Sequence, residues 1–547
     1  MQKNDELVFL PLGGSGEIGM NFNAYGFGPS NRRQWIVVDC GVTFGRETDS
    51  PGVDLVLPDI RYLAERREDV LGIVATHAHE DHIGAIAFLW PMLKCPVYAT
   101  PFTARLIEGK LAEAGLSVPV KEVSLGGSLS LAPFTIDFVS ITHSIPEPNL
   151  LAIRTPLGVI AHTGDWKLDP EPVVGVASDA AAIRKLGDEG VLALVCDSTN
   201  ALVPGHSGSE AQVRDSLAQL IGNLTGRVAV TAFASNVARL DSIAHAAHTH
   251  GRKIALVGRS MHKIVEAARV SGYLKEFPAI LDAAEASALP PGKVLYLVTG
   301  SQGEPRAALS RIALANHPDV QLGKGDAVVF SSRVIPGNEL AIFELHNKLS
   351  ALGVEVLTAE DHFVHVSGHP AREELAEMYR WTRPRIAVPV HGELRHMAEH
   401  ARLAKSLQVP QALVPANGQL YRLAPGPAEL IDEVPSGRIH MDGRVLVAEG
   451  EGFAKARRAM SFAGLIAITL VLDAKGRPAA DAAILAEGMP EPVRDAVRAV
   501  VDEALRRYNP KNTDVEELSE AVRRAARRAA QDAWGKKPIT RVTVVEL

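Results

Sequence analysis

The chain has 547 residues, 46% of them hydrophobic and 22% charged, with a net charge of −7. These values are ordinary for a globular protein of several domains, and no apolar run reaches the roughly 18 residues of a membrane span. The mild negative charge weighs slightly against nucleic acid as a partner, although a local basic groove matters more than the total. The three cysteines are too few for a disulfide framework. The N-terminal segment lacks the features of a signal peptide, so we expect a cytoplasmic protein without a membrane partner.

The first motif is a glycine loop, LGGSGEIG at residues 12–19, directly after an apolar run. Together with Asp39 at the end of WIVVD it has the outline of a dinucleotide-binding fingerprint. A Rossmann unit needs a helix between these two features. The connecting segment contains Gly26, Gly28 and Pro29, and helix interiors disfavour Gly by about 1 kcal/mol and Pro by about 3 kcal/mol. We therefore expect an antiparallel meander, no dinucleotide cofactor, and another role for Asp39.

A dense histidine cluster follows the apolar strand LGIVAT, where THAHEDH contains His77, His79, Asp81 and His82. Alternate residues of an extended segment point the same way, so His77 and His79 can converge on one metal ion. Asp81 and His82 lie where the chain turns into a predicted helix, IGAIAFLW, and can face a second ion. The alternative is a polar loop that is rich in histidine by chance, and the density of ligand-type residues after a buried strand disfavours it.

Three more residues of metal-binding type stand at the ends of later predicted strands: His143, Asp165 and His391. Each residue alone would be weak evidence for a metal site, but their shared position at strand ends strengthens the prediction for all three. His162 lies inside the strand before Asp165, and we expect it to be a packed, hydrogen-bonded neighbour.

A regular alternation of strands and helices begins near residue 206 and predicts an inserted parallel sheet. The strand IAVPVH then returns the chain to the first domain. Arginine pairs in the last predicted helix could touch RNA but more often form a solvated face. The predicted boundaries are a first domain at 1–205 and 371–450, an insertion at 206–370, a linker at 451–460, and a C-terminal α+β domain at 461–547.

Together these motifs resemble those of the bacterial ribonuclease J family, in the β-CASP branch of the metallo-β-lactamase superfamily. The superfamily pattern is carried by Asp39, THAHEDH, His143 and Asp165, and the β-CASP pattern by Asp197 in VCDSTN, the HVSGH run and His391. The resemblance implies an α/β fold: a metallo-β-lactamase αββα sandwich, an inserted β-CASP parallel-sheet domain, and a small C-terminal α+β domain.

The resemblance also implies a division of the ligands between two divalent ions. One ion would be held by His77, His79 and His143, the other by Asp81, His82 and His391, with Asp165 between them. Asp39 would accept hydrogen bonds from ligand histidines and fix their tautomers. Donors of these types suit zinc, with manganese or magnesium as alternatives. A structural calcium is further implied at Gly52, Asp54 and Asp442.

Two close divalent ions activate water for in-line displacement at phosphorus. Asp81 could orient the water or accept its proton, and His369 is our candidate general acid. Asp197 is the third expected catalytic residue. The turn before the helix PAREELAEMYRW is predicted to cradle a backbone phosphate, or alternatively to be only a helix-entry turn capped by serine. Its residues are His365, Val366, Ser367, Gly368 and His369.

By resemblance, the function is 5′-to-3′ exonuclease action on single-stranded RNA with a 5′ monophosphate, plus endonuclease cutting, in mRNA decay and rRNA maturation. Ser235, Asn236 and Arg333 are predicted walls of a pocket for the 5′ end, although an exposed arginine is by default only a surface group. A homodimer or homotetramer and RNA-degradation partners are expected. The alternatives are a DNA-directed β-CASP nuclease and a non-catalytic RNA-binding scaffold, and the complete set of ligand positions counts against the scaffold.

Overall fold

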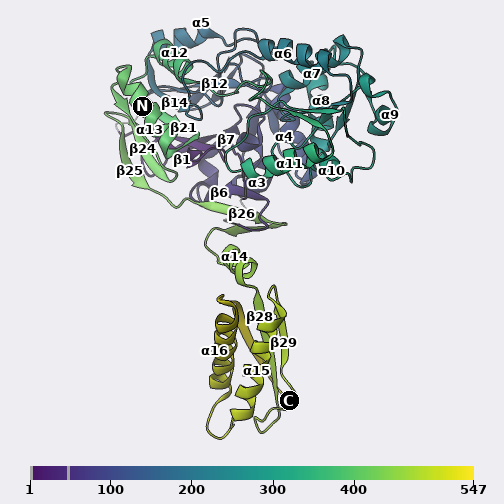
Figure 1. Ribbon diagram of the computed structural model, residues 1–547. Coiled ribbons are helices and arrows are strands. Elements are labelled where there is room, and N and C mark those ends of the chain that lie inside the picture. Colours follow the sequence, from purple (N-terminus) through teal and green to yellow (C-terminus); the bar gives the residue numbers. More distant parts are fainter. Residues whose placement is uncertain (1–3, 46–49) are drawn as a thin grey trace. The chain divides into compact units, whose positions relative to one another are not determined.

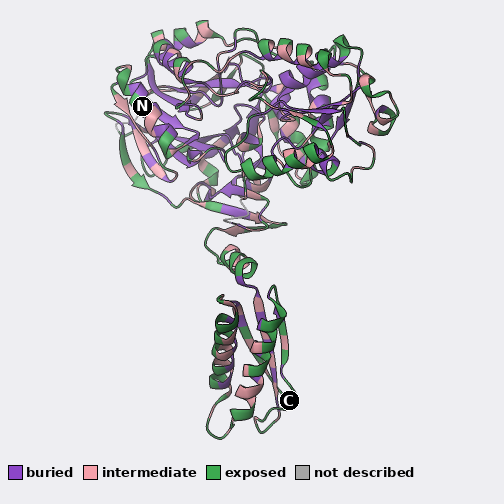
Figure 2. Ribbon diagram, in the orientation of Figure 1, coloured by how far each residue is buried: buried purple, intermediate pink, exposed green. Residues whose placement is uncertain are grey.

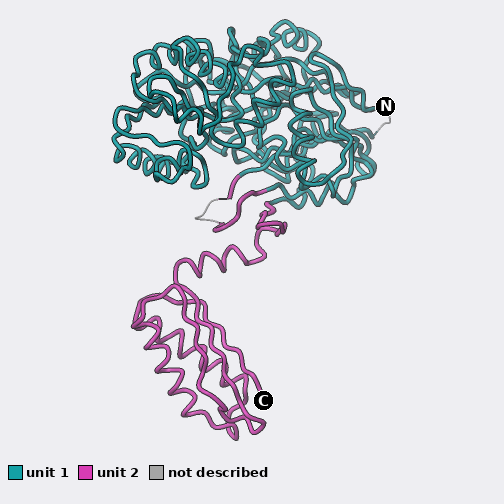
Figure 3. Tube along the Cα trace, turned by 90° about the vertical axis from the view of Figure 1, so that its right-hand side faces the viewer, with its two compact units in different colours: residues 1–43, 57–437 teal, residues 44–56, 438–547 magenta. Residues whose placement is uncertain are grey.

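The computed structural model, drawn in Figure 1, describes residues 4–45 and 50–547. The chain divides into two compact units, the first of residues 1–43 and 57–437 and the second of residues 44–56 and 438–547 (Figure 3). Within the described ranges, no helix combines the length and the apolar character needed to cross a bilayer.

An eight-stranded sheet forms one layer of the first unit. Its N-terminal part is the predicted meander, because β1 pairs antiparallel with β3 and β3 antiparallel with β4. The sheet then turns parallel, with β4 beside β7 and β7 beside β8. In spatial order the strands are β25 (Glu429–Glu433), β24 (Gln419–Ala424), β1 (Glu6–Gly13), β3 (Phe22–Gly28), β4 (Gln34–Val38), β7 (Val70–Val74), β8 (Val97–Ala99) and β9 (Val120–Glu122).

A seven-stranded sheet forms the second layer. Its first strands are antiparallel, whereas β13, β14 and β21 run parallel. Strand β14 is buried along its whole length, as its apolar sequence VLALVCD requires of a central parallel strand. The order is β10 (Ser128–Leu131), β11 (Phe134–Ser140), β12 (Asn149–Thr155), β13 (Gly158–His162), β14 (Val191–Asp197), β21 (Ile386–Val390) and β23 (Gln411–Ala412).

One hydrophobic core joins the two sheets. It contains Phe9 and Val74 from the eight-stranded sheet and Phe138 and Val388 from the seven-stranded sheet. A second core lies between the other face of the seven-stranded sheet and helices α5 (Ala180–Glu189), α12 (Arg372–Thr382) and α13 (Leu394–Ser406). Figure 2 shows buried strands inside and partly exposed helices outside, which is the layering of an αββα sandwich. The remaining helical segments of this sandwich are α1 (Arg61–Ala64), η1 (Arg67–Asp69), α2 (Glu80–Ile83), α3 (Ile86–Leu93) and α4 (Pro101–Glu113).

The insertion is a six-stranded sheet whose strands are all parallel. Its strands alternate with helices along the chain, as the sequence predicts for this segment. The strands are β17 (Ile280–Leu281), β16 (Lys253–Val257), β18 (Val294–Val298), β15 (Val228–Thr231), β19 (Ala327–Phe330) and β20 (Glu355–Leu357). The helical segments are α6 (Glu210–Asn223), α7 (Val237–Thr249), α8 (Arg259–Val270), α9 (Ala283–Ser287), η2 (Pro291–Lys293), α10 (Ala308–Ala313) and α11 (Glu339–Ala351).

The second unit contains a three-stranded sheet with two long helices, the predicted C-terminal α+β arrangement. The sheet order is β29 (Ala483–Glu487), β28 (Leu465–Leu472) and β30 (Ile539–Glu546), packed against α15 (Glu491–Arg507) and α16 (Val515–Trp534). The segment predicted as a linker is largely helical, as α14 (Phe453–Ala463). A small sheet of β27 (Val445–Ala448), β26 (Arg438–Asp442), β6 (Leu55–Pro58) and β5 (Thr43–Phe44) lies mostly in this unit.

Candidate metal centre

The predicted ligands meet at one edge of the sandwich because they follow strands of common direction. Asp39 and His77 come directly after the parallel neighbours β4 and β7. Asp165 follows β13, Asp197 ends β14 and His391 follows β21, and these three strands are also parallel. The carboxyl ends of such strands gather the side chains that a layered fold uses for chemistry.

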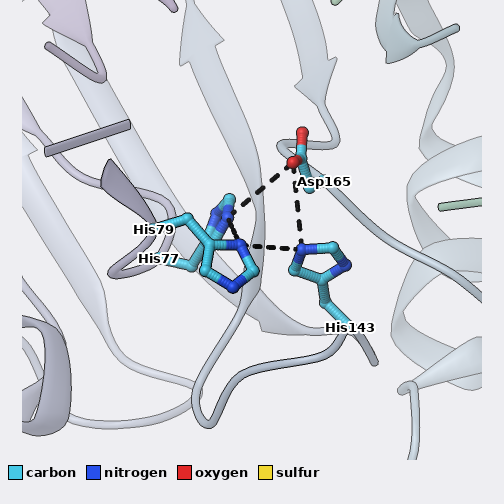
Figure 4. Close-up of side chains that lie close together, drawn as sticks. All are labelled: His77, His79, His143 and Asp165. Atoms are coloured by element: carbon cyan, nitrogen blue, oxygen red, sulfur yellow. Dashed lines mark hydrogen bonds and ion pairs between the residues drawn. The ribbon is translucent and has the colours of Figure 1, made fainter. Parts of the chain in front are cut away.

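Three imidazoles converge on one point. His79 Nδ1 lies 3.1 Å from His77 Nε2 and 3.0 Å from His143 Nε2. Asp165 Oδ2 lies 3.9 Å from His77 Nε2 and 3.8 Å from His143 Nε2. Figure 4 shows the four side chains pointing toward one another.

The hydrogen bonds at the far side of these rings leave lone pairs facing the centre. His143 Nδ1 donates to the carbonyl oxygen of Gly368 at 2.5 Å, and His77 Nδ1 lies 3.0 Å from Thr76 Oγ1. The Nε2 lone pairs of His77 and His143 then both face His79, whose ring can give a proton to only one of them. Ligand nitrogens at about 2.1 Å from a tetrahedral zinc lie about 3.4 Å apart. The spacing and the lone pairs therefore fit a divalent ion.

A second group lies on the other side of Asp165. His82 Nε2 is 3.2 Å from Asp165 Oδ2, and His391 Nε2 is 3.2 Å from Asp81 Oδ2. Asp165 Oδ1 lies 2.9 Å from His391 Nδ1, within ion-pair distance, but among the described residues no donor is aligned with it for a hydrogen bond. A buried carboxylate oxygen of this kind is costly unless a cation satisfies it. Both groups can hold a metal ion, and they share Asp165.

Burial and neighbouring charges shift the pKa values of the site histidines in different directions. Burial, with neighbouring imidazoles adding to it, lowers the pKa of His77 and of His143 well below 6.5, and burial lowers the pKa of His79 to about 4. For His391, burial alone would lower the pKa, but the Asp165 carboxylate outweighs it and raises the pKa well above 6.5. The first group is therefore neutral and rich in lone pairs, whereas His391 of the second group pairs with the Asp165 carboxylate.

Asp39 is fully buried below the centre, in a left-handed backbone conformation with φ of 65°. Its Oδ2 accepts a hydrogen bond from His82 Nδ1 at 2.7 Å, and its Oδ1 accepts one from the Thr76 backbone N–H at 2.8 Å. The first contact leaves His82 Nε2 directed at Asp165.

The glycine loop contacts both chain segments of the second group. The carbonyl oxygen of Gly14 accepts the His391 backbone N–H at 2.6 Å, and β2 (Ser15–Gly16) pairs in parallel with β22 (Gly392–Glu393). The Asn21 backbone N–H donates to the carbonyl oxygen of Asp81 at 2.9 Å. Gly14 has φ of 82°, and a Cβ there would lie 2.4 Å from Asn21 Oδ1, so only glycine fits.

His369 lies beside the ligands and is tied to Asp197. Its Nδ1 donates to Asp197 Oδ2 at 2.8 Å, and its ring centroid is 5.2 Å from that of His143. Burial lowers the pKa of His369, but the Asp197 and Asp165 carboxylates outweigh it and raise the pKa above 6.5. His369, Asp165, Asp197 and His391 form a third group that could hold a metal ion.

The turn 365–369 is held from several sides. A Cβ at Gly368 would lie 2.7 Å from the His143 ring, so this glycine lets His143 reach the main chain. Arg239 Nη1 lies 3.3 Å from His365 Nδ1 and donates to the Val364 carbonyl at 3.0 Å. The Val366 side chain is buried. Helix α12 begins only at Arg372, and its N-cap is Ala371 rather than serine, so the structure does not give Ser367 the capping role.

The three predicted wall residues differ in their surroundings. Asn236 is buried and caps α7: its Oδ1 accepts the Arg239 backbone N–H at 2.9 Å and its Nδ2 donates to Glu210 at 3.3 Å. Ser235 is partly exposed just before it. Arg333 is exposed in the segment after β19, and its Nη1 donates to Asn200 Oδ1 at 3.0 Å.

The implied calcium residues lie in the second unit, and among the described residues the carboxylate of Asp442 pairs with an arginine. Arg457 donates from Nη1 to Asp442 Oδ1 at 2.9 Å and from Nη2 to Asp442 Oδ2 at 2.7 Å, and Nη1 also donates to the Pro51 carbonyl at 3.3 Å. Gly52 and Asp54 are exposed. Calcium takes roughly six to eight oxygen ligands, whereas here a guanidinium already neutralises the carboxylate. In the described ranges, none of these residues joins a metal-holding group.

Four supporting residues were missed by the sequence analysis. Thr76 bridges Asp39 and His77, and Thr199 Oγ1 lies 3.2 Å from His391 Nδ1. Asn200 holds the 365–369 turn, and the fully buried Arg239 pairs with Glu210. A charged residue in the otherwise apolar face of α7 was a usable signal for Arg239. Thr199 and Asn200 lie inside the quoted motif VCDSTN, of which only the acid was interpreted.

Family models match four consecutive parts of the chain. They are "Metallo-beta-lactamase superfamily" over residues 23–229, "Ribonuclease J, beta-CASP domain" over 225–349, "Zn-dependent metallo-hydrolase RNA specificity domain" over 353–412 and "Ribonuclease J C-terminal domain" over 453–547. The fold and the site therefore define a metallo-hydrolase of the metallo-β-lactamase type with a β-CASP insertion, and its His/Asp clusters are compatible with a divalent metal site.

Curated relatives align over nearly the whole chain. The protein named Ribonuclease J from Sinorhizobium meliloti is 47% identical, covering 100% of this chain and 98% of its own length. Those from Thermus thermophilus and Mycolicibacterium smegmatis are 38% and 39% identical, covering 99% and 98% of this chain and 96% of their own lengths. The chain belongs to the ribonuclease J family.

A solved structure with a similar fold is a protein of unknown function from Enterococcus faecalis V583. It covers 76% of this chain and 99% of its own, with a TM-score of 0.53 and 15% sequence identity. This likeness concerns the fold alone.

Proposed function

We propose that this chain is a metal-dependent ribonuclease that degrades single-stranded RNA from its 5′ end, prefers a 5′ monophosphate, and also cuts internally. The observation that carries the proposal is the convergence of the predicted ligands into groups that share Asp165 at one edge of the fold. The relatives named Ribonuclease J and the match to an RNA specificity domain support RNA as the substrate.

The proposed centre holds two divalent ions, of which zinc fits the donors best, with manganese and magnesium as alternatives. One ion would be held by His77, His79 and His143. The other would be held by the second group, Asp81, His82 and His391, and Asp165 would lie between the two ions. When bound, such ions lower the pKa of water and offset charge at phosphorus. Asp165 belongs to both groups of potential ligands, which supports its place between the two ions.

Asp81 and His369 are the proposed groups for proton transfer. The Asp81 side chain is 30% exposed, whereas the Asp165 side chain is 3% exposed. Asp81 is therefore the carboxylate that can contact the attacking water. Asp197 fixes the His369 ring through Nδ1, which leaves Nε2 to protonate the departing 3′ oxygen. The raised pKa of His369, which results from Asp197 and Asp165 outweighing burial, keeps this proton available near neutral pH.

The turn 365–369 is the proposed cradle for a backbone phosphate. His365 accepts at Nδ1 from Arg239, so its proton is on Nε2 and can be donated to a phosphate oxygen. Arg333 would bind the 5′ phosphate, because its exposed guanidinium keeps donors beyond the one given to Asn200. Ser235 and Asn236 remain the proposed neighbours of that pocket.

The experiment compares 5′-monophosphorylated RNA, 5′-triphosphorylated RNA and DNA of matched sequence, each with and without a chelator. The expected result is mononucleotide release from the first RNA that chelation abolishes. Equal cleavage of DNA would favour the DNA-directed alternative, and absence of metal-dependent cleavage would favour the binding scaffold. The domain boundaries, the homodimer or homotetramer, the degradation partners and the cytoplasmic location stay predictions.

A further inference from the structure

Asn200 lies in the turn after β14 and connects two groups of the proposed site. Its Nδ2 donates to Ser367 Oγ at 2.8 Å and to the His369 carbonyl at 3.1 Å. Its Oδ1 accepts from Arg333 Nη1 at 3.0 Å. One amide therefore joins the phosphate-binding turn to the exposed arginine of the inserted domain.

The chemistry of this site requires an amide. Asn200 is 3% exposed, and a side-chain amide has two N–H donors and one acceptor oxygen. Both N–H donors of Asn200 bond to the turn, and its oxygen accepts a hydrogen bond from Arg333. An aspartate has the same shape and would pair more strongly with Arg333, but it could donate to neither acceptor of the turn.

Arg333 gives only part of its hydrogen-bonding capacity to Asn200. A guanidinium carries five N–H donors, and this side chain is exposed. Its charge is also felt close to the turn, since it contributes to the lowered pKa of His365 after burial and Arg239. The backbone is held as well, because Gln302 Nε2 donates to the Arg333 carbonyl at 2.9 Å. Arg333 thus has an anchored backbone and a guanidinium with donors left for a phosphate.

We propose that Asn200 is a positioning residue that couples a 5′ phosphate bound by Arg333 to the placement of His369. The inference rests on the proposed function. When the phosphate fixes the Arg333 guanidinium, the Asn200 amide is fixed with it, and the amide then holds Ser367 and the His369 main chain in the arrangement that directs the ring to the leaving oxygen. The 5′-end preference of the enzyme thereby depends on a residue that does not touch the phosphate.

The test is a double-mutant cycle with Asn200→Asp and Arg333→Gln, assayed on a 5′-monophosphorylated and a 5′-hydroxyl RNA of one sequence. Asn200→Asp should lower kcat/KM on the monophosphorylated RNA about 10- to 100-fold, because two hydrogen bonds to the turn are lost. The ratio of kcat/KM on the monophosphorylated RNA to kcat/KM on the 5′-hydroxyl RNA should fall toward one. The double variant should be within about twofold of the worse single variant, since coupled residues are not additive.

Arg306→Gln is the matched control, because Arg306 is also an exposed arginine of the inserted domain; it should keep the wild-type ratio. Bound metal, measured for every variant, should not change, and each variant should remain folded at the assay temperature by its melting curve, which separates positioning from loss of structure. Fully additive losses, or an unchanged end preference in Asn200→Asp, would overturn the coupling while leaving the proposed function intact. A wild-type enzyme that degrades both RNAs equally would overturn the proposed 5′ preference and the coupling together.

Discussion

The histidine centre and the Asp442–Arg457 cluster are two places where family resemblance implies a bound cation. In the first, Asp165 is buried among imidazoles and one of its oxygens has no hydrogen-bond partner. In the second, both oxygens of Asp442 accept from the Arg457 guanidinium. A motif thus tells which residue types are present, whereas the need for an ion depends on whether the protein already supplies a positive group.

The largest effect is expected from removing a histidine of the first group. His79→Ala should lower turnover of RNA about 1,000-fold or more, because metal ions supply several kcal/mol of transition-state stabilisation. Metal content, measured by elemental analysis, should fall with it. The control is His248→Ala, at an exposed histidine of α7, which should change neither turnover nor metal content. A His79→Ala protein that keeps both its metal and its activity would contradict the proposed metal site.

His369→Ala should lower kcat about 100- to 10,000-fold while bound metal stays at the wild-type level, because the proposed role of the ring is proton transfer. The pair of measurements distinguishes the two arrangements open to this residue. Loss of metal in this variant would instead make His369 a ligand, as the third group of potential ligands allows.

Asp39→Asn should weaken metal binding about 10- to 100-fold, since Asp39 orients His82 but does not face the centre. Titration with a competing chelator measures this change. Asp481→Asn, an exposed acid of the second unit, serves as the control. Affinity equal to that of the wild type would mean that other contacts of the His82 ring, such as that with Asn21 Nδ2, fix it instead of the Asp39 carboxylate.

The smallest effect is expected at the other cluster. Addition of calcium or of a calcium chelator should leave the melting temperature of the wild-type protein unchanged, because Arg457 already occupies Asp442. Arg457→Gln should lower it slightly, and calcium should then restore part of the loss. A calcium-dependent shift in the wild type would show that the guanidinium does not replace the ion.

The parts of the site that the sequence predicts well are those with a local signal. His77 and His79 alternate after an apolar strand, and the parallel strands that carry Asp165 and His391 have unmistakable apolar patterns. The Gly- and Pro-containing segment after the glycine loop likewise excluded a helix, and β3 confirms the strand.

The parts that escaped prediction depend on contacts between distant segments. Asn200 meets Arg333 across 133 residues and Ser367 across 167 residues, and no periodicity of either segment encodes that meeting. Arg457 was placed in a linker, because a short amphipathic segment with a flanking glycine gives little helical signal. Its pairing with Asp442, which closes off the implied calcium site, became visible only in three dimensions.

The contact between Gly14 and His391 has a consequence for the protein's own synthesis. The first ligands leave the ribosome long before the last, and at roughly 5–20 residues per second the interval between residues 77 and 391 is about 15–60 s. During that time the glycine loop has been synthesised, but β22 and His391, with which it pairs, have not. A nascent chain therefore lacks His391, and with it the complete proposed centre, until most of its length has been translated.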